Sequence, residues 1–161
     1  MQITRFNKQL TSPCIEIFLS NQGRFFDQRE FGMYESFLKN ERLTAEYYIA
    51  AEESVIIGCG GFEMTGAHQV DLNWGMVHRD FHRRGYGTAL LRYRLDRIKN
   101  LFGDATIRVE TSQHSKGFFE KHGFATKETK LDGFGPNIDY VLMTRMGGHQ
   151  CTASNVCLEF P

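Results

Sequence analysis

Apolar and polar residues follow a strand-like pattern over much of the first half of the chain. Strands are predicted for four stretches: Gln2–Phe6, Tyr47–Ala51, Val55–Met64 and Val70–Val77. Only the short turns Glu52-Glu53-Ser54 and Thr65-Gly66-Ala67 separate the last three stretches. Because short connections join antiparallel strands, the pattern predicts three consecutive antiparallel strands.

Helical spacing replaces this pattern at three places. Asp27 can cap a helix whose apolar positions are Phe31, Tyr34, Phe37 and Leu38. A longer helix begins near Gly87 and ends at Gly103-Asp104, with an apolar stripe of Leu91, Leu95, Ile98 and Phe102, backed by Leu90 and Leu101. A short helix over Lys116–His122 is stopped by Gly123.

Three further strands complete the predicted elements: Thr106–Thr111, Phe124–Lys130 and Ile138–Met146. This order is typical of a mixed α/β sheet in which a crossover helix joins two central strands. We therefore expect one α/β domain of the α+β type over residues 1–146. Residues 147–161 form a polar tail that we expect to be flexible.

Charge and composition exclude several classes of protein. The 161 residues carry 19 basic and 19 acidic side chains, so the surface as a whole does not attract nucleic acid or anionic membrane. No stretch approaches the roughly 18 apolar residues of a membrane span, and the start of the chain lacks a basic region followed by an apolar run. We expect a cytoplasmic protein with neither nucleic acid nor membrane as a partner.

The four cysteines show no C-x-x-C spacing. Cys14 and Cys59 lie in apolar segments, whereas Cys151 and Cys157 lie in the tail. Reduced thiols fit a cytoplasmic protein, and a disulfide in the tail is the alternative if the protein meets an oxidant. No metal site is expected, because His78 and His82 straddle a loop and lack further ligands.

A basic, glycine-rich turn lies between the strand ending at Val77 and the long helix. Gly85 and Gly87 allow a tight turn, and Arg83 and Arg84 add charge to the positive end of the helix. Such a turn suits a pyrophosphate, and a purely structural turn is the alternative. A dinucleotide fingerprint fails because Leu90 stands where glycine or alanine is required, and the Gly-Lys-Ser/Thr of a P-loop is absent.

The same segment, His82-Arg83-Arg84-Gly85-Tyr86-Gly87, resembles the acyl-CoA-binding motif Q/R-x-x-G-x-G/A of the GNAT acetyltransferase superfamily, with His82 at the first position. Phe118–Phe124 resembles that family's F-Y-E-K-x-G-F block. Ile56–Phe62 and Ile138–Met143 resemble two of its strands, so the likeness extends to Met146.

The resemblance implies the acyl-CoA N-acyltransferase fold, a sheet splayed between its fourth and fifth strands, where the pantetheine arm of acetyl-CoA lies. It implies a set of cofactor-binding residues: Met76, Val77, His78, His82, Arg83, Arg84, Gly85, Tyr86, Gly87, Thr88, Ser112 and Phe119. The backbone of Met76, Val77 and His78 would bind the arm, and Arg83–Thr88 would hold the pyrophosphate. Ser112 falls where the family often has asparagine.

The resemblance also implies direct attack of an amine on the thioester, which requires a proton acceptor. Asp71 is the first candidate base and Glu110 the second, the alternative being that each is an ordinary solvated or paired strand residue. Phe119 occupies the position of the family's proton-donating tyrosine and cannot donate. Ser112, His114, Ser115, Tyr140 or water could replace it, or the thiolate could leave unassisted.

We therefore expect an acetyl-CoA-dependent N-acetyltransferase that acts on a primary amine of a small molecule. A peptide or protein amine is the alternative acceptor. Because of Phe119, an acyl-CoA-binding or sensing module with little catalysis is the alternative function. The family resemblance also allows a homodimer.

Overall fold

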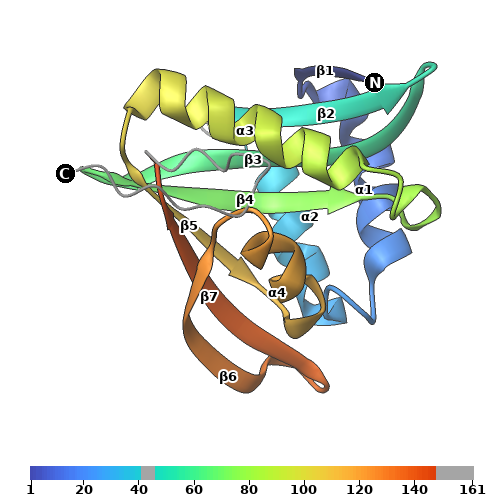
Figure 1. The fold of residues 1–161 in the computed structure, drawn as a ribbon. Coiled ribbons are helices and arrows are strands. Elements are labelled where there is room, and N and C mark those ends of the chain that lie inside the picture. The colour runs from blue at the N-terminus through green and yellow to red at the C-terminus, as the bar shows by residue number, and fades with distance from the viewer. Residues whose placement is uncertain (41–45, 148–161) are drawn as a thin grey trace.

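The computed structural model describes residues 1–40 and 46–147, which are built around a seven-stranded sheet (Figure 1). Its strands are β1 (Gln2–Arg5), β2 (Glu46–Glu52), β3 (Val55–Gly66), β4 (Gln69–Val77), β5 (Thr106–Thr111), β6 (Ala125–Gly135) and β7 (Ile138–Met146). They are ordered β1-β2-β3-β4-β5-β7-β6, and only β4 and β5 pair in parallel. The predicted mixed, mostly antiparallel sheet is confirmed. Apart from Gly147, the predicted tail lies outside the described residues.

Four helices cover the two faces of the sheet (Figure 1). On one face α1 (Thr11–Asn21) and α2 (Phe31–Lys39) pack in a core that includes Phe18, Tyr34 and Tyr47. On the other face α3 (Tyr86–Phe102) and α4 (Gln113–Glu120) pack in a core that includes Leu91 and Phe119. Three 3-10 turns complete the elements of the described residues: η1 (Lys8–Leu10), η2 (Gln28–Glu30) and η3 (Arg79–Phe81).

The helices differ from the predicted ones in three respects. Helix α1 was not predicted, although Cys14, Ile17, Phe18 and Asn21 are all buried at helical spacing. In α3, Leu101 was placed on the apolar stripe but is 47% exposed, whereas Arg94 lies on the buried side. Helix α4 begins at Gln113, three residues before the predicted start. The burial of Arg94 reflects contacts with Gly60, Gly61 and Gly75 of the sheet, which local spacing does not specify.

The sheet opens between β4 and β5, as expected for the fourth and fifth strands. Their pairing covers Gln69–Leu72 against Thr106–Val109, so Leu72 and Val109 form the last pair. Beyond it, β4 contains a bulge, where the register against β3 shifts between Cys59 and Gly61. Trp74 in the bulge has a φ of 41°, which is unusual for a large side chain. The bulge turns β4 away from β5 and leaves room for a ligand.

Candidate functional site

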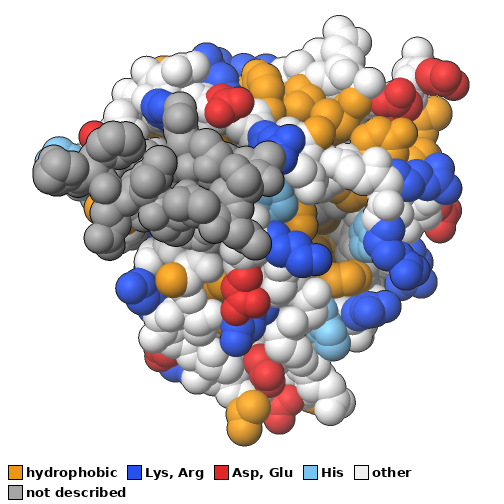
Figure 2. All heavy atoms as spheres, viewed as in Figure 1, with side chains coloured by type: hydrophobic (Ala, Val, Ile, Leu, Met, Phe, Trp, Pro, Cys, Tyr) orange, Lys and Arg blue, Asp and Glu red, His pale blue; other side chains and the backbone are white. Residues whose placement is uncertain are grey.

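A cavity of about 690 Å³ occupies the opening between β4 and β5. Figure 2 shows a hollow on this face, with apolar side chains at its floor and Arg, Lys and His side chains on its rim. Most of the predicted site residues line the cavity: Asp71, Met76, Val77, His82, Arg83, Gly85, Gly87, Thr88, Glu110, Ser112 and Phe119. His78, Arg84 and Tyr86 are not among its lining residues. The fold thus brings most of the predicted residues to one place.

The glycine-rich turn shapes one end of the cavity. Gly85 precedes α3 with a φ of 85°, and Arg83 has a φ of 60°, so the backbone has a positive φ at two positions before the helix begins. A Cβ at Gly85 would contact nothing within 4 Å, so glycine is required here for its backbone conformation. The first backbone amides of α3 lack partners within the helix, as at any helix N-terminus, and no side chain caps them. This end suits an anion.

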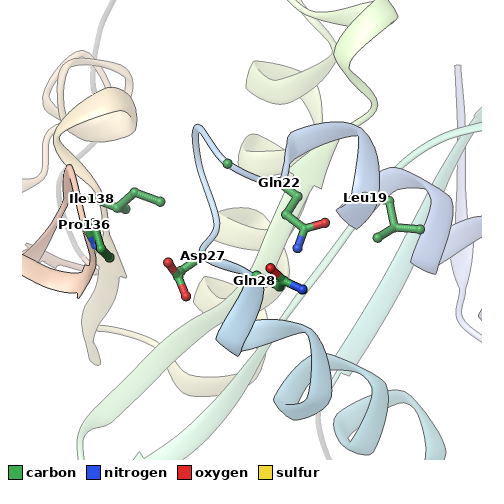
Figure 3. Close-up of a pocket in the computed structure, with 7 residues that line it drawn as sticks. Leu19, Gln22, Asp27, Gln28, Pro136 and Ile138 are labelled. Carbon is green, nitrogen blue, oxygen red and sulfur yellow. The ribbon is translucent and has the colours of Figure 1, made fainter.

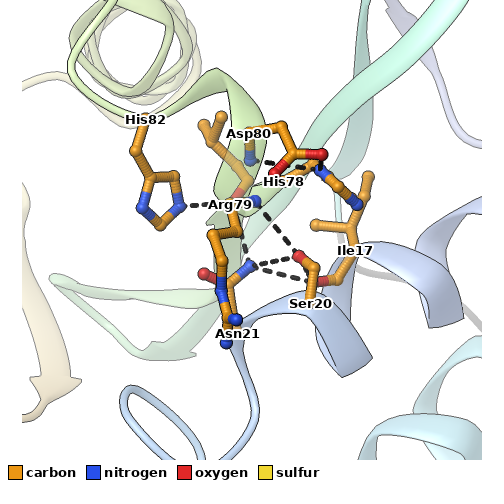
Figure 4. Close-up of polar contacts among 8 residues, drawn as sticks. Ile17, Ser20, Asn21, His78, Arg79, Asp80 and His82 are labelled. Atoms are coloured by element: carbon orange, nitrogen blue, oxygen red, sulfur yellow. Dashed lines mark hydrogen bonds and ion pairs between the residues drawn. The ribbon is translucent and has the colours of Figure 1, made fainter.

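The end of β4 is held in place by side chains from α1 and from the glycine-rich turn (Figure 4). Asn21 Nδ2 donates to the Val77 carbonyl at 2.9 Å, and His82 Nε2 lies 2.7 Å from the same oxygen. His78 N donates to the Ile57 carbonyl at 2.8 Å. The Val77 carbonyl and the His78 amide therefore already have partners within the chain. Both belong to the backbone groups that were predicted to bind the pantetheine arm. The sequence did not reveal Asn21, which is 3% exposed, because α1 was not predicted.

An ion-pair network also lines the cavity. Arg108 donates to Asp71 Oδ2 from Nε at 3.0 Å and from Nη2 at 2.6 Å, and Nη2 also lies 3.3 Å from Glu110 Oε1. The hydrogen bond to Asp71 raises the pKa of Arg108. Tyr140 Oη donates to Glu110 at 3.2 Å, and burial together with this carboxylate raises the pKa of Tyr140. The structure therefore brings both predicted bases, Asp71 and Glu110, to one arginine.

Aromatic side chains surround a further part of the cavity. Phe25, Phe26, Trp74 and Phe134 line it, together with Glu30. Burial raises the pKa of Glu30, whose Oε2 accepts a hydrogen bond from Asp27 N at 2.7 Å. The sequence did not single out Glu30, although Asp27-Gln28-Arg29-Glu30 has the spacing of a capping box.

The connection between α1 and α2 also meets the loop between β6 and β7. Arg29 Nη2 donates to the Phe134 carbonyl at 3.0 Å. A second hollow, of about 540 Å³, lies beside this contact, with Asp27 and Gln22 on one side and Pro136 and Ile138 on the other (Figure 3). The contact bridges the two segments next to the main cavity.

The candidates for a proton donor are close to the cavity, but Phe119 supplies no hydroxyl. Phe119 is 8% exposed and packs edge-on against Phe118 and Phe124. Ser112, His114 and Ser115 line the cavity. Tyr140 is not among the lining residues and donates to Glu110 instead. The cavity therefore favours Ser112, His114 and Ser115 over Tyr140 as candidates.

Within the described residues, cysteines, metal-ligating side chains and apolar helices add no further site. Cys14 and Cys59 are free and buried, whereas Cys151 and Cys157 lie outside the described residues. Within residues 1–40 and 46–147, no group of three or more His, Cys, Asp or Glu side chains could hold a metal ion. None of the helices described is both long and apolar enough to cross a membrane.

Comparison with known proteins gives consistent matches. A family model for the GNAT acetyltransferase domain matches residues 44–126. An uncharacterised N-acetyltransferase of Staphylococcus saprophyticus is 33% identical over 129 residues, which span 68% of this chain and 84% of that protein.

Two solved structures illustrate the fold. An aminoglycoside 6'-N-acetyltransferase complexed with coenzyme A superposes with a TM-score of 0.72 at 15% identity, covering 94% of this chain and 100% of that one. A ribosomal-protein-alanine N-acetyltransferase from Brucella melitensis superposes with a TM-score of 0.73 at 15% identity, covering 91% and 99%. By their names, these enzymes act on a small molecule and on a protein, so the shared fold leaves the acceptor open.

Proposed function

Since the chain belongs to the GNAT family of N-acetyltransferases, we propose that it transfers the acetyl group of acetyl-CoA to the primary amine of a small molecule within a ternary complex. One observation carries this proposal. A single cavity has an uncapped helix N-terminus with Arg83 at one end and a cluster of carboxylates farther along its wall. An anionic cofactor and a cationic acceptor would thus meet in it.

The cofactor end fits acetyl-CoA by its donors and its shape. The first amides of α3, with Arg83 beside them, would bind the pyrophosphate. The pantetheine arm would then enter the opening between β4 and β5, where Met76, Ser112 and Phe119 line the cavity. Acetyl-CoA is a co-substrate that leaves as CoA.

The acceptor end fits an amine with an apolar body. Glu30, Glu63, Asp71 and Glu110 line the cavity, and their carboxylates attract an ammonium group. Trp74 and the neighbouring phenylalanines suit an apolar or aromatic body and also favour a cation by contact with the ring faces. The bond from Arg29 to the Phe134 carbonyl bridges the segments between which a protein acceptor would dock. This bridge favours a small molecule over a protein acceptor.

The reaction requires the ammonium to lose a proton before the nitrogen attacks the thioester carbonyl. Both oxygens of Asp71 already accept hydrogen bonds, from Arg108 and Gln69. The side chain of Glu110 is 45% exposed and borders the cavity. We therefore favour Glu110 as the base and assign Asp71 to holding Arg108 in position.

Calorimetric titration with acetyl-CoA, with ATP and NAD as controls, tests the cofactor part of the proposal. Binding of acetyl-CoA alone supports it, and a panel of amines followed by release of the CoA thiol then identifies the acceptor. The panel contains aromatic and aliphatic amines and a peptide with a free N-terminus. Failure to bind acetyl-CoA overturns the proposed function, and turnover of the peptide alone overturns the small-molecule assignment.

A further inference from the structure

Arg94 places a buried positive charge beside the bulge of β4. The residue is 4% exposed and lines the cavity from α3. Its Nη1 donates to the Gly61 carbonyl at 3.3 Å, which is long for a hydrogen bond, and among the described residues its Nε has no partner. A buried guanidinium with so few hydrogen bonds is costly for the fold, so its presence requires an explanation.

Two glycines create the space that the guanidinium occupies. A Cβ on Gly75, in the bulge, would lie 2.7 Å from both Nη1 and Nη2 of Arg94. A Cβ on Gly60, on the neighbouring strand β3, would lie 3.0 Å from Nη1. The strands thus lack side chains at the two positions where Arg94 approaches them. The arginine and the two glycines form one arrangement.

No carboxylate among the described residues balances the charge of Arg94. The groups whose negative charge would act on it are Tyr47 on β2 and Cys59 on β3, and burial lowers the pKa of Arg94 to about 10. Burial raises the pKa of Tyr47 well above its ordinary value, so Tyr47 is neutral. Burial opposes ionisation of Cys59 as well, but side-chain hydrogen bonds with Cys14 and Tyr34 lower its pKa. In the part of the chain that the structure describes, a Cys59 thiolate is therefore the one group that could pair with Arg94 in place of a bound anion.

The distance along α3 from its first residue to Arg94 is close to the length of the pantetheine arm. Arg94 lies eight residues after Tyr86, the first residue of α3, which is about 12 Å along the helix axis. The arm has about as many backbone bonds as four extended residues and so spans about 14 Å. A pyrophosphate bound at the start of α3 would therefore place the CoA sulfur near the guanidinium. Phe119, on the same cavity, has no proton for that sulfur.

We propose that Arg94 stabilises the negative charge on the CoA sulfur as the thioester is cleaved. This inference rests on the proposed function. The amine nitrogen forms its bond to the acetyl carbon, the carbon–sulfur bond breaks and its electron pair passes to sulfur. Glu110, whose side chain is 45% exposed, passes the first ammonium proton to solvent before the attack and accepts the second proton as the nitrogen becomes an amide. The thiolate stays paired with Arg94 until CoA departs. A proton donor at position 119 is then unnecessary.

The thiol pKa of bound CoA tests this role directly. Ultraviolet absorbance of the thiolate is followed against pH, with enzyme bound to S-methyl-CoA as the reference that subtracts the protein's own cysteines and tyrosines. A cation in contact with the sulfur lowers the thiol pKa by about one to three units relative to free CoA. Arg94→Met should return it to the value of free CoA, while Arg94→Lys should keep most of the shift.

Matched variants separate this role from a structural one. Arg92→Met removes an exposed arginine from the same helix and should leave the bound thiol unchanged. Gly75→Ala displaces the guanidinium without removing it and should give a smaller shift. In Arg94→Met we expect kcat to fall about 100-fold with the Kd for acetyl-CoA within about threefold of the wild type. The melting temperature should be unchanged or higher. If Arg94→Met does not fold, Arg94→Lys and Gly75→Ala carry the test.

Four results would overturn the proposal. The thiol pKa of bound CoA could be ordinary in the wild type, or its shift could persist in Arg94→Met. The free enzyme could show a thiolate signal that is removed by Cys59→Ser and also by Arg94→Met, while the thiol pKa of bound CoA is unshifted. Cys59 would then be the partner of Arg94. The wild type could prefer succinyl-CoA to acetyl-CoA, with an unshifted thiol pKa of bound CoA, and Arg94→Met could abolish that preference. Arg94 would then bind a carboxylate on the acyl group. Failure to bind CoA at all contradicts the proposed function instead.

Discussion

Asp71 on β4 and Arg108 on β5 lie directly opposite each other, and two nitrogens of Arg108 contact the same carboxylate oxygen, at 2.6 and 3.0 Å. The next pair along the strands, Leu72 and Val109, is the last before the sheet opens. The ion pair therefore ties the two strands together at the point where they separate. Because its side chains are 19% and 32% exposed, we expect it to contribute about 1 kcal/mol to stability.

This arrangement predicts different roles for the two carboxylates. Glu110→Gln should lower kcat about 100-fold or more and remove the acidic limb of the pH–rate profile, because a general base is lost. Asp71→Asn should lower the melting temperature and kcat modestly and keep the acidic limb. The control is Glu128→Gln, which removes an exposed carboxylate that pairs with Lys130. If the limb disappears in Asp71→Asn and persists in Glu110→Gln, Asp71 is the base.

The left-handed glycine before α3 allows a controlled test of the pyrophosphate site. Gly85→Ala should weaken acetyl-CoA binding about tenfold or more, because alanine disfavours a φ of 85° and shifts the helix amides. Gly103→Ala is the matched control, since Gly103 follows the other end of α3 with a φ of 60° and likewise has nothing within 4 Å of a Cβ. Calorimetry and thermal melts on both variants separate strain from binding. Equal loss of affinity in the two variants would remove the support for this site.

A buried tyrosine pair supports the bulge of β4. Tyr47 Oη donates to the Trp74 carbonyl at 3.1 Å and lies 3.0 Å from Tyr34 Oη. Tyr47→Phe leaves that carbonyl without this partner and should destabilise the fold by about 1–2 kcal/mol. It should also lower kcat more than it weakens acetyl-CoA binding. Denaturant unfolding and steady-state kinetics check both effects, with Tyr93→Phe as a control on α3. An unchanged kcat would show that the bulge needs no such support.

The buried carboxyl of Glu30 makes stability depend on pH. Burial raises its pKa in the folded state above that of the unfolded chain. The stability that Glu30 contributes is therefore full below the unfolded-state pKa and is lost as pH rises through the folded-state pKa. Glu30→Gln keeps an acceptor for Asp27 N and should raise the melting temperature at pH 7 but not at pH 4. The control is Glu35→Gln, which changes a partly exposed residue of α2 that pairs with Lys39. An equal shift at both pH values would contradict this explanation.

Local sequence signals predicted the parts of the fold that local forces determine. The glycines of the turn and the apolar stripe after it identified α3, and short turns identified the antiparallel strands. Pro13 is compatible with α1 because it lies in the first turn, and Cys14, Ile17 and Phe18 have helical spacing. The local pattern of this segment is therefore that of a helix.

Contacts between distant residues could not be predicted in this way. The pairing of Asp71 with Arg108 depends on the register of two strands that a whole helix separates. The position of Arg94 gave a partial signal, since it lies between Leu91 and Leu95 on the buried side of α3. A charged side chain is usually exposed, and the space that admits Arg94 comes from Gly60 and Gly75 on two other elements. Sequence spacing within one helix cannot reveal such a space.

A hydroxyl group introduced at position 119 should be able to replace the guanidinium of Arg94 if both positions act on the departing sulfur. Phe119→Tyr places a hydroxyl where the resembling family has its proton donor, and in the wild type it should change kcat less than threefold. In the Arg94→Met background the same substitution should restore kcat about tenfold, because the thiolate then gains a donor that it lacks. The double-mutant cycle measures this coupling, with Phe118→Tyr as the control beside it on α4. Additive effects in the cycle would show that the two residues act on different steps.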